Sequence, residues 1–580
     1  MPEPIAYRVE ARNLHTHLFD VTLTIAKPQG LQRVSLPVWI PGSYLVREFS
    51  KNLQNLTALQ GRTKLQATQL DKCTWEIACS PSKPLLVRYQ IYAHDNSVRT
   101  AWLDPDRGFF NGTSVCLRVQ GQEASVHEIE LLLPVQSTGW SVATGLTLLK
   151  TSKQGWGVYG AANYDELVDC PVEMGAFWQG SFSACGIPHR FVVAGALPGF
   201  DGARLLADTQ KICEQEIRFW HGSKKPPFSS YLFMLNAVDD GYGGLEHSNS
   251  TALICNRTDL PRLNDFKVSE GYTTLRGLIS HEYFHTWNVK RLRPSEFANC
   301  DYGRENYTEL LWFFEGFTSY YDDLLLRRAN LLDNAGYLKL LNKTINQVLQ
   351  TPGRQTQSVA EASFDAWVKY YRPDANTPNA TVSYYSLGAL VALCFDLTLR
   401  SEGHTTLDEV MRSLWLRCKA GPMREADFAS VLQTLGKRSF AAELKSWVHS
   451  KGELPLRQLL AEHGVTVHDD PAQLAQRLGL RVIDANGIHV KTVLSGGAAE
   501  KAGFAAGDEW LGVETIKPPG GWRMQRLDDL LLYAGTAKKV VALVSRDKRL
   551  VRLELTIPPA AATWRLAIHD ASKVDAWLSN

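Results

Sequence analysis

The stretch GYTTLRGLISHEYFH, residues 271–285, combines an apolar stripe with two histidines spaced four residues apart. The spacing of the stripe predicts an α-helix, and its members are Leu275, Leu278 and Ile279. On that helix His281 and His285 lie on one face, one turn apart, where their imidazoles can chelate one zinc ion at about 2.0–2.1 Å. Glu282 projects beside the same site, so we expect it to be the general base that activates the attacking water.

A catalytic zinc site needs a third protein ligand and leaves its fourth position open. The spacing most common in aminopeptidases would put a Glu at position 304, but this chain has Arg304. Glu315 is favoured because it lies in the apolar segment TELLWFFEGFTSYY, where a carboxylate needs a partner, and Gly316 beside it permits the close approach of another helix. The competing carboxylates are Glu296, Glu305 and Glu309. The prediction is one Zn²⁺ per chain, bound by His281, His285 and Glu315.

The bulk properties limit the remaining possibilities. The chain has 580 residues, which is too long for one hydrophobic core, so several domains are expected. With 62 Lys and Arg against 60 Asp and Glu, it lacks the excess of positive charge typical of proteins that bind nucleic acid. No segment approaches about 20 uninterrupted apolar residues, so no membrane span is expected. The N-terminus lacks a signal-peptide pattern and the ten cysteines are scattered, which favours the cytoplasm, or the periplasm if a leader has been removed.

The pattern of short segments predicts a multidomain α+β chain. Residues 1–195 contain β-type segments broken by Gly, Pro, Asn and Asp, as in an antiparallel β domain. Residues 196–455 begin with a helix and a buried strand and then become mostly helical. Residues 465–560 return to β-type segments, and residues 561–580 are expected to be a C-terminal tail.

Several separated motifs occur in the order found in one family. HEYFHTWNVKRLRP and the N-terminal LPVWIPGSYLVREFSKNL closely resemble the glycyl aminopeptidase family of PDZ-containing gluzincin metallopeptidases. WFFEGFTSYY looks like the helix that carries the third zinc ligand in gluzincin aminopeptidases, although more residues precede it here. The resemblance implies a thermolysin-like, mostly helical catalytic domain and hydrolysis at free N-termini, with a preference for Gly or Ala.

The run Gly243-Gly244-Leu245-Glu246-His247 resembles the exopeptidase motif of gluzincin aminopeptidases. The resemblance implies that Glu246, with Gly243 and Gly244, binds the substrate's α-amine. A carboxylate on an edge strand can pair with that ammonium group. His247 stands where the broader group has Asn, and a surface carboxylate in a Gly-rich turn is the alternative interpretation of Glu246.

Tyr385, in YYSLGALVA, resembles the Tyr of a Tyr-x-Lys-Gly segment that stabilises the tetrahedral intermediate. A phenol O–H directed at a developing oxyanion is a suitable donor. Leu387 replaces the usual Lys and Tyr384 is an adjacent rival, so a tyrosine of an amphipathic core helix is the alternative.

The segment SGGAAEKAGFAAGDEWL, residues 495–511, closely resembles the central part of PDZ domains. The resemblance then implies a carboxylate-binding loop that holds peptide C-termini, formed by Leu478, Gly479, Leu480 and Arg481. Packing against the catalytic domain without peptide binding is the alternative.

Together these features predict a zinc aminopeptidase that acts on peptides. Two alternatives remain: a PDZ-guided endopeptidase, for which Glu246 would hardly matter, and a non-catalytic peptide-binding scaffold. The basic run after the zinc helix, residues 288–294, receives no catalytic role, because cations also interact favourably with a helix C-terminus.

Overall fold

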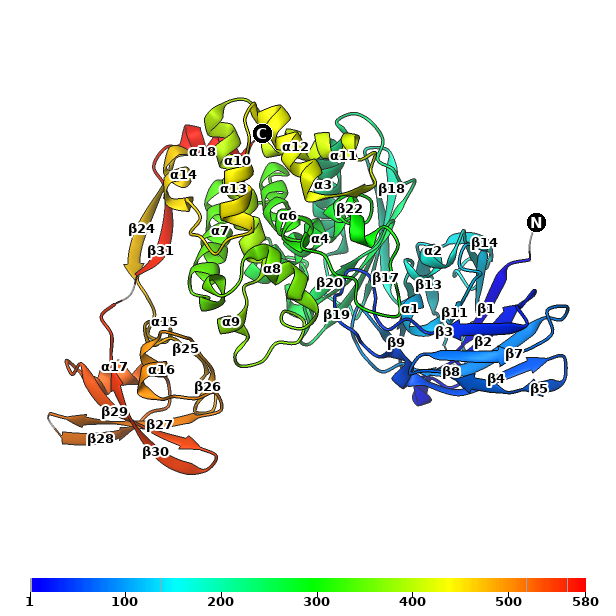
Figure 1. Ribbon diagram of the computed structural model, residues 1–580, viewed down its shortest axis with the longest axis horizontal. Coiled ribbons are helices and arrows are strands. Elements are labelled where there is room, and N and C mark those ends of the chain that lie inside the picture. The colour runs from blue at the N-terminus through cyan, green and yellow to red at the C-terminus, as the bar shows by residue number, and fades with distance from the viewer. Residues whose placement is uncertain (1–2, 136, 518, 561, 580) are drawn as a thin grey trace. The chain divides into compact units, whose positions relative to one another are not determined.

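The computed structural model describes residues 3–135, 137–517, 519–560 and 562–579. The chain divides into two compact units, which are residues 1–307 with 415–424, and residues 308–414 with 425–580. The predicted multidomain α+β organisation is confirmed, with a β-rich N-terminal region and a helical middle region (Figure 1).

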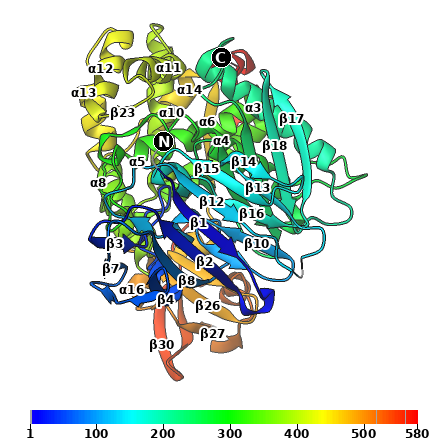
Figure 2. The ribbon, with the colours of Figure 1, turned by 90° about the vertical axis from the view of Figure 1, so that its right-hand side faces the viewer.

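The first unit begins with an eight-stranded sheet. Along β2, LFDVTLTI, every second residue is buried, as expected for a strand with one face in a core. Strands β1, β2, β8 and β4 run side by side in Figure 2. In sheet order the strands are β14 (Thr147–Thr151), β15 (Gly157–Ala161), β12 (His127–Leu131), β1 (Ile5–Glu10), β2 (Leu18–Ile25), β8 (Leu85–Tyr92), β4 (Leu53–Gln60) and β5 (Thr63–Leu65).

Two four-stranded sheets complete the β-rich region. They share one hydrophobic core with the large sheet. Two short helices, α1 (Gly112–Val115) and α2 (Tyr164–Val168), interrupt the strands. The first sheet contains β13 (Ser141–Thr144), β16 (Val172–Gly175), β10 (Arg107–Phe110) and β9 (Ala101–Leu103), and the second contains β11 (Arg118–Val119), β3 (Leu31–Ser35), β7 (Thr74–Ala78) and β6 (Ala67–Gln69).

A five-stranded mixed sheet follows, and β20 is its edge strand. Helices α3 (Gly202–His221) and α4 (Glu270–Phe284) belong to this part of the unit, and α4 contacts β20 and β21. The strands in order are β17 (Trp178–Ala184), β18 (Ile187–Ala194), β19 (Tyr231–Val238), β21 (Ser250–Asn256) and β20 (Gly243–Glu246). A two-stranded parallel pair, β22 (Arg293–Pro294) and β23 (Pro422–Met423), joins the returning segment 415–424 to this unit.

The second unit begins with the helical region. Its central helix, α10, is largely buried and contacts α5 and α6. The helices are α5 (Leu311–Phe314), α6 (Gly316–Arg328), α7 (Asn334–Leu349), α8 (Val359–Phe364), α9 (Thr377–Ala380), α10 (Tyr384–Glu402), α11 (Leu407–Arg417), α12 (Glu425–Gly436), α13 (Ala441–Glu443) and α14 (Leu456–Glu462).

A six-stranded module with its own hydrophobic core follows in the same unit. The chain enters and leaves it through an antiparallel ribbon of two strands, β24 (Val465–Pro471) and β31 (Ala562–Ile568). The module contains β25 (Leu480–Ile483), β26 (Ile488–Val493), β27 (Glu509–Ile516), β28 (Pro519–Arg523), β29 (Lys539–Arg546) and β30 (Arg549–Thr556), with α15 (Leu474–Leu478), α16 (Ala498–Ala502) and α17 (Asp529–Ala534).

The last twenty residues differ from the expected tail. They supply β31 and α18 (Ala571–Leu578), a helix capped by Asp570. Trp577 is buried and its indole N–H points to the hydroxyl of Tyr320 on α6 at 3.4 Å. The C-terminal segment is therefore part of the folded unit.

One helical stretch of the described chain, Thr377–Glu402, has the length and hydropathy of a membrane span. Its most apolar window is 72% buried inside the protein, which is also a property of central core helices.

Candidate active site

Helix α4 is held in place by polar contacts with α3. Ser269 caps its N-terminus by accepting a hydrogen bond from the backbone N–H of Tyr272. Further along, the Tyr272 hydroxyl donates to Asp208 on α3 at 2.9 Å, and the Ser280 hydroxyl donates to Glu216 at 3.0 Å. These buried bonds fix the rotation of α4 and hence the face that carries the two histidines.

The helix ends at Phe284, at the end of the stretch that the sequence predicts to be helical. His285 is its C-terminal cap, and residues 286–289 leave the helical path. The carbonyl of Asn288 lies 2.8 Å from Nδ1 of His285, and since a carbonyl can only accept, Nδ1 carries the proton. The lone pair of Nε2 is thereby available to a metal. Nε2 of His285 lies 3.1 Å from Nε2 of His281, so both nitrogens face the same point.

The loop after α4 contains a strained residue. Val289 has φ of 143°, which a β-branched side chain rarely adopts and which costs about 1–3 kcal/mol. Arg291 bridges the loop by donating to the carbonyls of Thr286 (2.7 Å) and Ser248 (3.0 Å). Such a conformation persists only where its surroundings determine it, so these contacts are part of the site's architecture.

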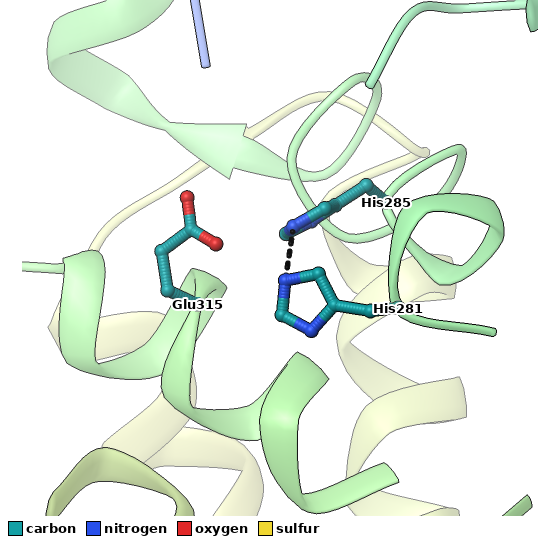
Figure 3. A group of neighbouring side chains, drawn as sticks. All are labelled: His281, His285 and Glu315. Atoms are coloured by element: carbon teal, nitrogen blue, oxygen red, sulfur yellow. Dashed lines mark hydrogen bonds between the residues drawn. The ribbon is translucent and has the colours of Figure 1, made fainter. Parts of the chain in front are cut away.

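Figure 3 shows His281, His285 and Glu315, whose ligand atoms all lie within 4.8 Å of one another. Glu315 is 2% exposed and joins α5 to α6. Among the described residues the competing carboxylates belong to no such group, and Glu296 and Glu309 are exposed. Two imidazoles and one carboxylate form the donor set of a hydrolytic zinc centre.

Two glycines, Gly316 and Gly388, allow the helices next to Glu315 to pack closely. A Cβ on Gly316 would meet the Cα of Gly388 on α10 at 2.5 Å, and a Cβ on Gly388 would meet the carbonyl oxygen of Trp312 at 2.4 Å. The close approach expected at Gly316 is therefore present. It brings α6 and α10 into backbone contact, which side chains at these positions would prevent.

Glu246 ends the edge strand β20 and is 4% exposed. Its carboxylate belongs to a second group, with Glu282 and His285, whose ligand atoms lie within 4.8 Å of one another. A Cβ on Gly244 would lie 2.1 Å from the Glu282 carboxylate, and a Cβ on Gly42 would lie 2.5 Å from that of Glu246. Both carboxylates are thus pressed against glycine backbone, and Gly243 opens the strand with φ of 151°.

A cavity of about 540 Å³ adjoins this group within the first unit. Glu246, Gly42 and His247 line it together with Asp169 and Lys290. Burial disfavours the charged form of Asp169, but the nearby Lys290 ammonium and the hydrogen bond from His247 outweigh this effect and hold the pKa of the carboxyl well below its usual range. Asp169 is therefore an anion in the wall of the cavity, with its side chain 20% exposed.

The structure distinguishes the two adjacent tyrosines. Tyr384 is fully buried, whereas Tyr385 is partly accessible and its hydroxyl lies 3.3 Å from that of Tyr371. Burial, followed by the negative charge of Glu315, raises the pKa of Tyr385 well above its ordinary value. Its phenol is therefore protonated at neutral pH and lies near Glu315.

The predicted carboxylate-binding loop lies at the edge of the six-stranded module. Leu478 ends α15, Gly479 caps it in the left-handed conformation with φ of 73°, and Leu480 and Arg481 begin the edge strand β25. The Gly479 carbonyl accepts a hydrogen bond from Leu494 N–H at 2.8 Å.

The comparisons with known proteins identify the family of this chain. The Peptidase M61 N-terminal domain model matches residues 6–176, and the M61 glycyl aminopeptidase model matches residues 274–391. An aminopeptidase N family protein from Idiomarina loihiensis has 37% sequence identity to the chain and a TM-score of 0.94, over 99% of this chain and 100% of that one. The chain belongs to the M61 glycyl aminopeptidase family. It is therefore a hydrolase of the peptidase class.

The M61 glycyl aminopeptidase model spans the two histidines, Glu282, Glu315 and Tyr385. An M1 zinc metallopeptidase from Deinococcus radiodurans gives a TM-score of 0.45 at 13% identity, over 78% of this chain and 95% of that one, in a structure whose protein is bound to a Tyr-Ser-Ala substrate. That TM-score is too low to establish a shared fold. A comparison with curated proteins gave no match.

Sequence reasoning missed Gly42, Arg99 and Asp169. Gly42 belongs to a Pro-Gly turn, which is a signal for a turn but not for contact with Glu246. Arg99 donates to the Gly244 carbonyl at 3.0 Å from a position 145 residues away in sequence. Asp169 carries no sequence signal of its role, since its partners lie far along the chain.

Proposed function

We propose that this M61 family member is a zinc-dependent aminopeptidase that removes small N-terminal residues, Gly or Ala, from peptides. The observation that carries the proposal is the buried group formed by Glu246, Glu282 and His285. An amine-binding carboxylate so close to a general base and a metal ligand suits cleavage one residue from a free N-terminus.

The residues fit a single zinc ion held by His281, His285 and Glu315. The carbonyl of Asn288 sets the His285 tautomer in which Nε2 has a lone pair that can bind a metal, and the donor set is the one that zinc hydrolases use. Zinc bound there would polarise the scissile carbonyl and lower the pKa of water at the site toward about 7.

The protein's own groups supply the remaining steps. Glu246 pairs with the α-ammonium group and so places the first peptide bond at the site. Glu282 takes the proton of the attacking water and delivers it to the leaving amine. Tyr385 donates its hydroxyl proton in a hydrogen bond to the developing oxyanion. Membership of the M61 glycyl aminopeptidase family supports the preference for small first residues.

The proposal includes two structural assignments. The catalytic region is assigned a thermolysin-like fold, supported by the zinc helix beside an edge strand. Residues 465–560 are assigned as a PDZ domain with a carboxylate loop at Leu478–Arg481, supported by the left-handed Gly479 and the edge position of β25 in the sheet. Peptide C-termini are its proposed ligands.

The test compares the wild type with Glu282→Gln and Glu246→Gln. Zinc content is measured by elemental analysis, and hydrolysis is followed on Gly-, Ala- and Leu-anilides and on N-acetyl-Gly-anilide. We expect one zinc per chain in all three proteins and cleavage of the Gly and Ala anilides by the wild type. Glu282→Gln should lower kcat about 10²–10⁴-fold, because the general base is lost. Glu246→Gln should raise KM, because the ammonium loses its charged partner.

Two outcomes would contradict the proposal. A wild type with stoichiometric zinc that releases nothing from Gly- or Ala-anilide is not this aminopeptidase. Equal cleavage of the acetylated substrate, with Glu246→Gln as active as the wild type, would indicate the endopeptidase alternative.

A further inference from the structure

Asp169 contacts the segment that follows the amine-binding carboxylate. It is the C-terminal cap of α2, in the β-rich region. One carboxylate oxygen accepts the backbone N–H of Ser248 at 3.0 Å, and the other lies 3.3 Å from Nδ1 of His247. Asp169 therefore holds the two residues directly after Glu246.

The same carboxylate holds the loop that follows the zinc helix. Nζ of Lys290 lies 2.6 Å from Asp169, and both side chains are largely buried. The backbone N–H of Lys290 donates to the carbonyl of His285 at 3.0 Å. Between them lies Val289, in its unfavourable conformation, and the Asn288 carbonyl that orients the His285 ring. Asp169 is thus connected to a zinc-binding histidine through a short and strained segment.

We propose that Asp169 is a positioning residue that fixes the separation between Glu246 and His285, and thereby the register of cleavage. This inference rests on the proposed aminopeptidase function. Asp169 itself does not need to touch the substrate, because its oxygens already bind Lys290, Ser248 and His247. It acts through the two elements that it joins.

The separation between Glu246 and His285 matters because an aminopeptidase cleaves the peptide bond one residue from the free amine. Consecutive Cα atoms are about 3.8 Å apart, so the amine site and the scissile bond must keep a spacing of that order. A misplacement of about 1 Å can lower a rate about 10²-fold. Removing the common anchor should therefore weaken the use of the free amine more than it weakens the zinc site.

The chain offers a matched control. Glu173 is also a buried carboxylate of the first unit, and Arg107 binds both of its oxygens at 2.8 Å. No described contact links this ion pair to Glu246 or to the loop after α4. Glu173→Gln therefore reports the cost of breaking a buried ion pair without disturbing the register.

The experiment measures zinc content, thermal unfolding, and kcat and KM on Gly-anilide and N-acetyl-Gly-anilide. The proteins are the wild type, Asp169→Asn, Lys290→Gln and Glu173→Gln. We expect Asp169→Asn to retain zinc, to raise KM for Gly-anilide at least tenfold, and to lower the preference for the free amine at least tenfold. Glu173→Gln should lower the unfolding temperature and leave KM and the preference unchanged.

A replacement variant and a double variant complete the experiment. If Asp169→Asn does not fold, Lys290→Gln replaces it, since it breaks the same link while Asp169 keeps its bonds to residues 247 and 248. In a Glu246→Gln background, Asp169→Asn should reduce the amine preference no further, because it acts through Glu246.

The outcomes separate this inference from the function on which it rests. If the wild type prefers free amines and both Asp169→Asn and Lys290→Gln keep its KM and its preference, the positioning role is refuted and the aminopeptidase assignment stands. If the wild type itself does not distinguish the two substrates, the proposed function fails, and the positioning role fails with it.

Discussion

Residues 269–291 and the α5–α6–α10 helices each carry predicted site residues, and different kinds of interaction hold each of them in place. The first segment is fixed by buried polar contacts, such as Ser280 with Glu216 and Lys290 with Asp169. The helices of the second are fixed by apolar packing and by the backbone contact between Gly316 and Gly388. Buried polar networks impose one geometry but depend on every partner, whereas close-packed helices tolerate the loss of a polar group and fail when volume is added.

Among the α5–α6–α10 helices, the largest effect is expected from Tyr385. Tyr385→Phe should lower kcat about 10²–10³-fold, because an oxyanion donor is lost, with little change in KM or zinc content. Tyr384→Phe is the control, since Tyr384 is fully buried and should affect stability instead. Steady-state kinetics on Ala-anilide measure both variants, and an equal loss of kcat in the two would remove Tyr385 from its proposed role.

Low pH should lower the stability of the region around the zinc helix, α4. Burial lowers the pKa of His189 to about 4 from 6.5, and its Nε2 contacts the hydroxyl of Tyr283 on the zinc helix at 2.9 Å. The unfolded chain binds this proton more readily, so stability is lost as pH falls from about 6.5 to 4, by about 3 kcal/mol in total. Urea unfolding at pH 7 and pH 4.5 should show a smaller acid loss for His189→Gln; an identical loss would mean that other groups dominate.

Two glycine substitutions compare the close-packed α5–α6–α10 helices with the region around the zinc helix. In Gly388→Ala the new methyl meets backbone that cannot move aside, so about 1–3 kcal/mol of unfolding free energy should be lost. In Gly244→Ala it meets the Glu282 carboxylate, which can rotate away, so stability should change little while kcat falls. Unfolding curves and kinetics on the same preparations measure both quantities. A loss of kcat alone in Gly388→Ala, with a loss of stability in Gly244→Ala, would contradict the prediction.

The smallest effect concerns the six-stranded module. Asn379 on α9 donates to the Val493 carbonyl and accepts from Ser495 N–H, both at 2.9 Å. Asn379→Ala should remove about 0.5–1.5 kcal/mol per bond from this contact and make the module more sensitive to limited proteolysis, with anilide hydrolysis unchanged. Asn379→Asp retains an acceptor and should be intermediate; unchanged proteolysis in both variants would show that the contact contributes nothing.

The sequence was informative where a residue's role depends on its near neighbours. The spacing of His281 and His285 predicted a shared face, and the apolar surroundings of Glu315 separated it from the rival carboxylates, which the structure places outside the group. The assignment of all three residues to zinc remains a prediction. The edge position of β20 also agrees with expectation.

Other features depend on partners far along the chain. Nothing local to Asp169 indicates Lys290, and nothing local to Gly42 indicates Glu246. The strained Val289 after the zinc helix lies in a loop bridged by Arg291, whose carbonyl partners include Ser248, and no local pattern indicates that contact. The final helix was missed because its stability comes from burying residues such as Trp577 against the helical region.

The ribbon formed by β24 and β31 has a consequence for how this chain is organised. Because Pro471 pairs with Ala562, the segment between them is inserted into what would otherwise be a plain hairpin. A two-residue Asn-Gly turn would suffice to close that hairpin, so the whole six-stranded module is topologically dispensable for the helices that flank it. The C-terminal helix α18 would still follow β31 and contact Tyr320. The helical region could therefore gain, lose or exchange the six-stranded module without a change in its own connections.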